Sequence, residues 1–208
     1  MKTVYSKYIK RVLDFIISLL ALTVLSPLLL VLTLVGAVKM RGNPFFVQER
    51  PGRNGRVFRL IKLRSMTNEK KNGELLPDEE RLTGYGRFLR RTSLDELPEL
   101  LNILVGHMSI VGPRPLLVKY LPLYNEHQAR RHEVRPGLTG WAQVNGRNSI
   151  TWEQKFDYDV WYVDHVSFAL DVRIVMMTVR SVLKREGISG ENNATMAEFE
   201  GSREKTNV

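Results

Sequence analysis

An uncharged stretch of 24 residues, positions 15–38, constrains this chain more than any other sequence feature. A straight helix of that length would measure about 36 Å, and the hydrocarbon core of a bilayer is about 30 Å thick. Length alone therefore predicts a helix that enters a membrane. A cleaved signal peptide is the weaker interpretation, because its apolar region usually spans only about 7–15 residues.

The pair Ser26-Pro27 divides this stretch into two equal halves. Pro27 has no backbone N–H to bond the carbonyl of Thr23, and its ring crowds that turn, so a sharp kink is expected. The hydroxyl of Ser26 is expected to bond to a freed carbonyl, because exposed backbone is costly in lipid. Each half reaches about half the bilayer, which predicts a helix-break-helix hairpin.

Charge on both sides of the apolar stretch favours a re-entrant hairpin over a helix that spans the membrane. Basic residues flank the stretch on both sides: Lys2, Lys7, Lys10 and Arg11 before it, and Lys39, Arg41, Arg50, Arg53, Arg56 and Arg59 after it. A spanning helix would place one basic flank outside, against the positive-inside tendency. We therefore expect both flanks on the cytoplasmic face; a kinked spanning helix is the alternative.

The composition of the 208 residues, with a net charge of +9, indicates an anionic partner. Nucleic acid and an anionic membrane surface both fit that charge, and the apolar anchor makes the membrane the simpler interpretation. No groove-reading or base-stacking motif is present, so we expect no nucleic acid partner. The chain has no cysteine, which excludes disulfides and thiolate zinc sites, and its four histidines make no H-x-x-x-H pair.

The remaining sequence predicts a small α/β domain, mostly α. Residues 45–50 and 56–62 have strand character, and the Pro-Gly-Arg-Asn-Gly turn between them predicts a hairpin. Residues 170–185 form an amphipathic helix pattern suited to a membrane interface. The predicted organisation is a membrane hairpin at residues 1–40, a cytoplasmic catalytic domain at 41–187 and a polar tail at 188–208.

Asp95 and Glu96 are adjacent carboxylates in the sequence Ser93-Leu-Asp-Glu96. This S-x-x-E pattern is a capping box, so both acids are expected in the first turn of a helix that begins near Pro98. Ordinary capping is the simpler interpretation. The surrounding cations and glycine-rich loops favour a phosphate site instead, where a carboxylate can bind Mg²⁺ or attack phosphorus.

Four other residues have side chains suited to such a site. Arg114 lies between Pro113 and Pro115, so its planar guanidinium is aimed with little entropy left to lose. Lys62 ends a predicted strand, and Arg147 follows a glycine-rich segment; either can face the same anion. Asp159 lies in an aromatic-rich helix. For each, a surface turn, a solvated strand edge or a simple salt bridge is the alternative.

Five motifs in this order resemble the monotopic phosphoglycosyl transferases among the bacterial sugar transferases. They are Phe46-Val-Gln-Glu-Arg-Pro-Gly52, Lys62-Leu-Arg-Ser-Met66, Ser93-Leu-Asp-Glu-Leu-Pro98, Val111-Gly-Pro-Arg-Pro115 and the segment from Arg135 to Asn148. The resemblance covers about residues 10–201. The short chain is most similar to the minimal transferases that act with bacillosamine phosphate. Two departures are His107, where the family usually has Asp, and Leu63, which replaces a usual aromatic residue.

The resemblance implies transfer of a sugar 1-phosphate from a UDP-sugar, here UDP-N,N'-diacetylbacillosamine, to undecaprenyl phosphate, with UMP released and Mg²⁺ required. It makes Asp95 the nucleophile that takes the phosphosugar, and Glu96 its assistant; both are implied Mg²⁺ ligands. It places Lys62, Arg90, Arg114 and Asp159 around the phosphates. It implies a monotopic protein of the inner membrane whose catalytic domain faces the cytoplasm.

Several alternatives stay open at this level. UDP-galactose, UDP-glucose or a UDP-N-acetylhexosamine are other donors for the same reaction, and a homodimer is one of the assemblies the chain allows. In another functional class, a basic scaffold bound to anionic lipid would need the cations and the phospholipid surface. It would not need the adjacent carboxylates.

Overall fold

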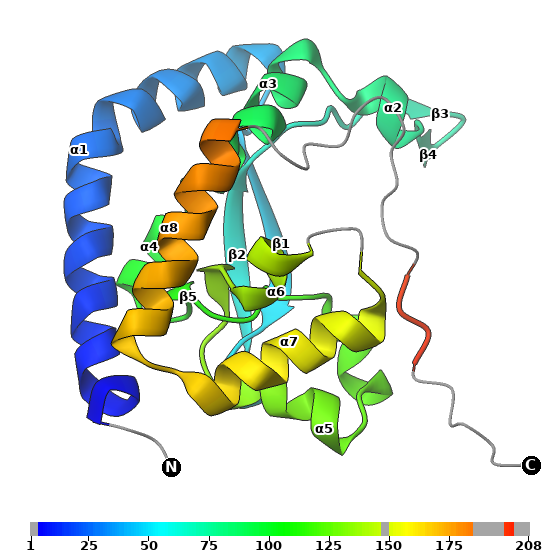
Figure 1. The fold of residues 1–208 in the computed structure, drawn as a ribbon. Helices are drawn as coiled ribbons and strands as arrows, with labels where there is room; N and C mark the ends of the chain where they lie inside the picture. Colours follow the sequence, from blue (N-terminus) through cyan, green and yellow to red (C-terminus); the bar gives the residue numbers. More distant parts are fainter. Residues whose placement is uncertain (1–3, 147–149, 185–197, 202–208) are drawn as a thin grey trace, which may run out of the picture.

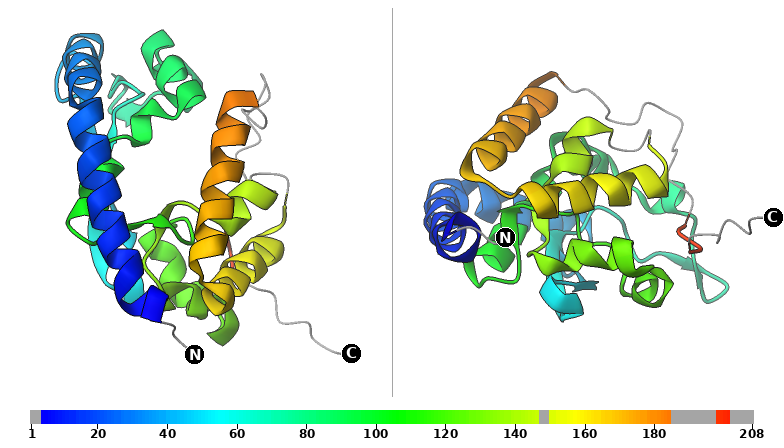
Figure 2. Two further views of the ribbon diagram at one scale, coloured as in Figure 1. Left: turned by 60° about the vertical axis from the view of Figure 1, so that its left-hand side comes forward. Right: turned by 60° about the horizontal axis from the view of Figure 1, so that its bottom comes forward.

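The computed structural model describes residues 4–146, 150–184 and 198–201. Its first element is a short π-helical turn, Tyr5–Ile9, that continues directly into the long helix α1, Lys10–Lys39. The helical segment Tyr5–Lys39 is long and apolar enough to cross a membrane by length and composition. Helix α1 lies along the outside of the molecule, as Figures 1 and 2 show.

Helix α1 bends but is not broken. It continues as one α-helix through Pro27, and its ribbon turns sharply part-way along (Figure 1). The predicted break at Ser26-Pro27 is therefore corrected to a bend within one helix. Ser26 Oγ donates to the carbonyl of Thr23 at 2.8 Å, which confirms the predicted back-bond to the carbonyl that Pro27 leaves without its usual donor.

Both arms of α1 pack against the rest of the protein along one side. Leu22 and Leu25 contact a core cluster that includes Phe58 and Leu100, and Leu32 lies in a second cluster with Leu63 and Leu89. The opposite side of α1 is apolar and exposed, as in these residues: Phe15, Ile16, Leu20, Val24, Leu30, Leu34 and Val38. An apolar exposed face of this size favours a lipid environment.

Polar contacts also attach the start of α1 to distant elements. Arg11 donates to the carbonyls of Ile103 and Leu104, each at 2.7 Å, and Lys10 pairs with Asp171 at 2.6 Å. Asp14, which is buried, accepts the backbone N–H of Ile110 at 3.0 Å. The membrane-facing helix and the remaining domain are thus fastened together by charged and buried groups.

The predicted hairpin is confirmed. Strands β1, Phe45–Pro51, and β2, Val57–Leu63, pair antiparallel, with Pro51 opposite Val57 and Phe45 opposite Leu63. Asn54 and Gly55 in the connecting turn have positive φ values of 56° and 71°, which suits their residue types. This ribbon runs through the middle of the view in Figure 1. Lys62 lies next to the last residue of β2.

The other described elements are short, apart from two helices. The small strands pair as β3, Lys70–Lys71, with β4, Glu74–Leu75, and β5, Ser109–Val111, in parallel with β6, Gly137–Thr139. The helices are α2, Asp78–Arg81; α3, Gly84–Thr92; α4, Glu99–Leu104; α5, Glu126–Ala129; α6, Trp141–Asn145; α7, Trp152–His165; and α8, Phe168–Lys184. Short 3₁₀ helices are Arg53–Gly55, Leu94–Glu96, Val118–Leu123 and Arg130–Glu133. The predicted α/β class, mostly α, is confirmed, as is the predicted C-terminal helix, α8.

Candidate active site

Asp95 and Glu96 lie in the 3₁₀ turn Leu94–Glu96, which leads into α4. The predicted capping box is wrong: Ser93 has a left-handed backbone with φ of 55° and its side chain caps nothing. Its backbone N–H instead ends α3 by bonding the carbonyls of Arg90 and Leu89. Helix α4 begins at Glu99, so the expected boundary near Pro98 is confirmed.

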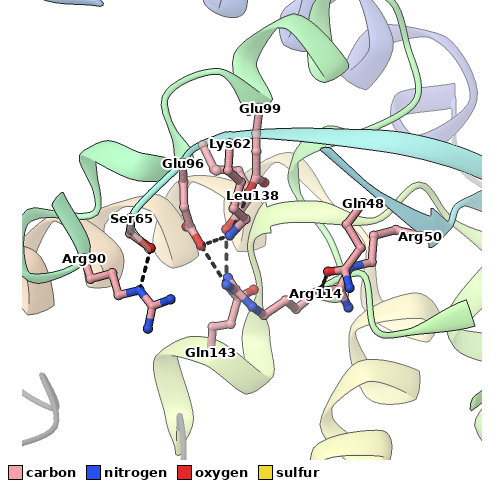
Figure 3. A network of polar contacts seen from close by, with 10 residues as sticks. All are labelled: Gln48, Arg50, Lys62, Ser65, Arg90, Glu96, Glu99, Arg114, Leu138 and Gln143. Atoms are coloured by element: carbon pink, nitrogen blue, oxygen red, sulfur yellow. Dashed lines mark hydrogen bonds and ion pairs between the residues drawn. The ribbon is translucent and has the colours of Figure 1, made fainter. Parts of the chain in front are cut away.

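Glu96 is the point where two predicted cations converge (Figure 3). Its Oε1 accepts a hydrogen bond from Lys62 Nζ at 2.7 Å and another from Arg114 Nη2 at 2.6 Å. Lys62 comes from β2 and Arg114 from the loop after β5, so distant parts of the chain meet here. Burial raises the pKa of Glu96, but Arg114 and Lys62 outweigh burial and lower this pKa to about 2. Glu96 is therefore ionised at neutral pH.

Asp95 differs from its neighbour in having no ion-pair partner within the described residues. Burial raises the pKa of the Asp95 carboxyl, and the charge of Glu96 raises it further, whereas Lys62 and Arg114 oppose that rise. A partly buried carboxylate next to cations, and not neutralised by a direct pair, is suited to attack an electrophile or to bind a metal ion.

Glu99 is a third acid of the cluster, and sequence reasoning missed it. Its side chain is 3% exposed and its Oε1 lies 3.1 Å from Lys62 Nζ. Burial raises the pKa of Glu99 to about 7; Glu96 adds to this rise and Lys62 opposes it. The signal was available, because Glu99 follows Glu96 by three residues and a helical turn brings such positions together.

Arg90 lies at the edge of the same group (Figure 3). Its Nε donates to Ser65 Oγ at 3.0 Å, and no ion pair to Arg90 exists within the described part of the chain. Gln143 lies beside Arg114 and donates to the carbonyl of Leu138 at 3.1 Å, while its Oε1 is buried with no hydrogen-bond partner among the described residues. Arg90 therefore has donors free for an anion, and Gln143 has an acceptor free.

Asp159 does not join this group. It is 2% exposed, and its Oδ2 accepts hydrogen bonds from Arg131 Nη2 at 2.7 Å and Nε at 3.0 Å. Arg131 also donates to the backbone carbonyl of Arg114 at 2.8 Å. The structure thus matches the salt-bridge alternative for Asp159, and this pair supports the Arg114 loop from behind. Arg147 lies outside the described residues.

The oxygen ligands available here suit Mg²⁺. No group of three or more acidic or histidine side chains in the described ranges is arranged to hold a metal ion by itself. Mg²⁺ commonly binds one or two carboxylates together with substrate phosphates and water, so a pair such as Asp95 and Glu96 is sufficient on the protein side. The residues fit an ion bound jointly with a diphosphate.

Comparison with known proteins identifies the family of the chain. The sequence profile of the family described as bacterial sugar transferase matches residues 5–185. The chain belongs to the bacterial sugar transferase family. It is 54% identical to the uncharacterized sugar transferase EpsL of Bacillus subtilis, over 93% of this chain and 96% of that protein.

Relatives with more specific names are longer proteins. The chain is 40% identical to the UDP-glucose:undecaprenyl-phosphate glucose-1-phosphate transferase of Xanthomonas campestris, over 84% of this chain and 38% of that protein. It is 35% identical to the undecaprenyl-phosphate galactose phosphotransferase of Salmonella typhimurium, over 88% of this chain and 42% of that protein. The chain spans about two fifths of the length of these two relatives.

Proposed function

We propose that this sugar transferase moves a sugar 1-phosphate from a UDP-sugar to a polyprenyl phosphate and releases UMP. The observation that carries this proposal is Glu96 held by Lys62 and Arg114, directly beside the unpaired Asp95. Two cations and two acids within one cluster match the handling of a diphosphate. Relatives named for this reaction with glucose and galactose support the same chemistry.

In the proposed reaction the Asp95 carboxylate attacks the sugar-bearing phosphorus. The bond from that phosphorus to the bridging oxygen breaks, UMP leaves with that oxygen, and an acyl phosphate joins the sugar phosphate to Asp95. A phosphate oxygen of the lipid acceptor then attacks the same phosphorus and frees the carboxylate. The product is a polyprenyl diphosphate sugar, and no other reactant is consumed.

The surrounding side chains have separate roles in this proposal. Lys62 and Arg114 hold Glu96 and offer positive charge to the phosphates, and Arg90 adds a guanidinium with free donors. Arg147 contributes from a segment outside the described residues. Asp159 acts indirectly, because its partner Arg131 fixes the backbone of Arg114.

We also propose that Asp95 and Glu96 hold Mg²⁺ together with the donor diphosphate. The ion would supply charge neutralisation at the phosphates as UMP departs. Lys62 and Arg114 would then share Glu96 with the ion, which keeps that carboxylate ionised and in place. Activity should be lost when EDTA removes divalent ions and should return with added Mg²⁺.

We propose that α1 is re-entrant, so that both of its ends lie on the cytoplasmic side of the inner membrane. The bend of α1 and the exposed apolar side chains of α8 support it; those of α8 are Phe168, Val172, Met176, Val179 and Val182. Single cysteines at Val4 and Asn43, in a chain without cysteine, should react with an impermeant maleimide from the cytoplasmic face only. Labelling of the two positions from opposite faces would establish a spanning helix.

The test of activity is UMP release from a panel of UDP-sugars mixed with undecaprenyl phosphate and Mg²⁺. The panel includes UDP-N,N'-diacetylbacillosamine, which the sequence resemblance favours, and UDP-glucose, UDP-galactose and UDP-N-acetylhexosamines. Asp95→Asn should give no UMP, whereas the matched control Asp157→Asn, at a surface acid paired with His127, should keep the wild-type rate. Lipid binding without UMP from any donor would favour the non-catalytic scaffold.

A further inference from the structure

A short segment near the C-terminus, Glu198–Gly201, docks on the catalytic domain far from α8 in sequence. Phe199 is only 4% exposed, and its ring packs among four aromatic rings, with centroid distances of 5.0 Å to Phe156, 5.5 Å to Trp152, 5.8 Å to Tyr120 and 5.9 Å to Tyr124. This segment lies beyond residue 185, where the family match ends. We call these five side chains the aromatic cluster.

Polar contacts hold the same segment in place. The backbone N–H of Phe199 donates to Tyr120 Oη at 3.4 Å, and Glu198 pairs with Lys119 at 2.5 Å on the surface. The exposed ion pair contributes little by itself, whereas burial of a whole phenyl ring is strongly favourable. The ring of Phe199 is therefore the main anchor of the segment.

The aromatic cluster is in contact with Arg131. The guanidinium of Arg131 lies over the rings of Phe156 and Tyr124, at 5.7 Å and 5.8 Å from their centroids, and its Nη1 donates to Tyr124 Oη at 3.4 Å. These are two of the rings that Phe199 packs against. Loss of Phe199 would open a cavity beside both rings and let them move relative to the guanidinium.

Arg131 in turn fixes the loop that carries Arg114. The Arg114 carbonyl accepts from Arg131 Nη2, and in the described part of the chain it has no other donor. Pro113 and Pro115 on either side have no N–H to offer. Arg114 Nη2 then reaches Glu96 at 2.6 Å. The contacts therefore run without a gap from Phe199 through the rings, Arg131 and Arg114 to Glu96.

We propose that Phe199 is a positioning residue for the active site: the C-terminal segment closes the aromatic cluster and thereby sets Arg131 and the Arg114 loop. This inference rests on the proposed function, because Arg114 is taken to hold the donor phosphates. Release of the segment from the aromatic cluster would weaken binding of the donor without altering a reacting group.

The first test compares Phe199→Ala with a chain that ends after Gly201, which keeps the whole docked segment. We expect kcat/KM for the donor to fall about tenfold in Phe199→Ala and to stay unchanged in the shortened control. Hydrogen exchange in the peptide of residues 109–117, measured without substrate, should become faster in Phe199→Ala only. Wild-type kinetics and wild-type exchange in Phe199→Ala would overturn the proposal.

A double-mutant cycle separates this role from general destabilisation. In an Arg114→Ala background, Phe199→Ala should cause less than about a twofold further loss, because its effect acts through Arg114. The same loss in both backgrounds would show that Phe199 acts elsewhere.

A measurement on the wild-type chain covers the case in which Phe199→Ala does not fold. Coupling is reciprocal, so bound UDP should slow hydrogen exchange in the peptide that contains Phe199. Unchanged exchange at saturating UDP would contradict the coupling. A wild-type enzyme that binds UDP but releases no UMP from any donor would overturn the proposed function instead, whereas exchange in the Phe199 peptide at saturating UDP would still decide the positioning role.

Discussion

Two sets of buried acids and cations lie close together in this protein, and they are built differently. In the pair of Asp159 with Arg131, both side chains are almost fully buried, at 3% and 1% exposed, and the guanidinium donates twice to one carboxylate. In the other set, Glu96 holds two cations, of which Arg114 is 45% exposed, and Asp95 beside it is unpaired. The closed pair satisfies itself, whereas the open set leaves a carboxylate and a half-exposed guanidinium available to a ligand.

The largest effect should come from breaking the closed pair. Asp159→Asn leaves the charge of Arg131 buried without its counterion, which should lower the free energy of unfolding by about 3–5 kcal/mol. Glu96→Gln should lower it less, because Arg114 is 45% exposed and Lys62 keeps Glu99 as a partner, yet it should remove most activity. Urea denaturation in detergent, with UMP release measured on the same samples, checks both. Equal destabilisation by the two changes would contradict the distinction.

His132 follows Arg131 of the closed pair directly in the sequence, and its ionisation should make the stability of the protein depend on pH. Burial lowers the pKa of His132 to about 4, and the charge of Arg131 adds to the lowering. The unfolded chain therefore binds a proton below pH about 6.5 that the folded protein takes up only near pH 4. The contribution of His132 to the free energy of unfolding should therefore be intact above pH 6.5. It should fall by up to about 3 kcal/mol as the pH drops towards 4.

The matched variant for this pH dependence is His132→Gln, which has no ionisable side chain. Its denaturation midpoint should change less than that of the wild type between pH 6.5 and 4. Parallel curves for the two proteins would show that His132 does not carry the acid sensitivity.

A smaller effect on activity is expected when a cation of the open set keeps its charge but loses its planar shape. Arg114→Lys retains a cation near Glu96 but lacks the planar fork that binds two phosphate oxygens. We expect kcat/KM for the donor to fall about tenfold, roughly 1.4 kcal/mol of transition-state stabilisation, with little change in unfolding. Near-wild-type kinetics would make Arg114 a structural arginine, like Arg131.

The sequence predicted the parts of this structure that depend on local chemistry. Pro27 and Ser26 have backbone consequences within one helical turn, so the bend and the back-bond followed from them. The strand pair β1–β2 followed from its turn residues. Lys62, Glu96 and Arg114 were named separately, and the structure places Lys62 Nζ at 2.7 Å and Arg114 Nη2 at 2.6 Å from Glu96 Oε1.

The wrong predictions depend mainly on contacts between residues that are far apart in the sequence. The partner of Asp159 is Arg131, 28 positions earlier, and no local pattern reveals a buried pair of that kind. The Ser93 capping box failed because the end of α3 takes the same residue as its left-handed C-cap. Phe199 was assigned to the polar tail at 188–208, since its four aromatic neighbours are distant in sequence.

The most direct measurement is made with the donor and Mg²⁺ but without any lipid acceptor. If Asp95 is the nucleophile that the open set prepares, wild-type enzyme should release close to one UMP per active site. Mass spectrometry should then find a sugar phosphate on the peptide that contains Asp95. The Asp95→Asn variant should show neither signal. No UMP before acceptor is added, and no adduct, would contradict a covalent route and make Asp95 a metal ligand or general base.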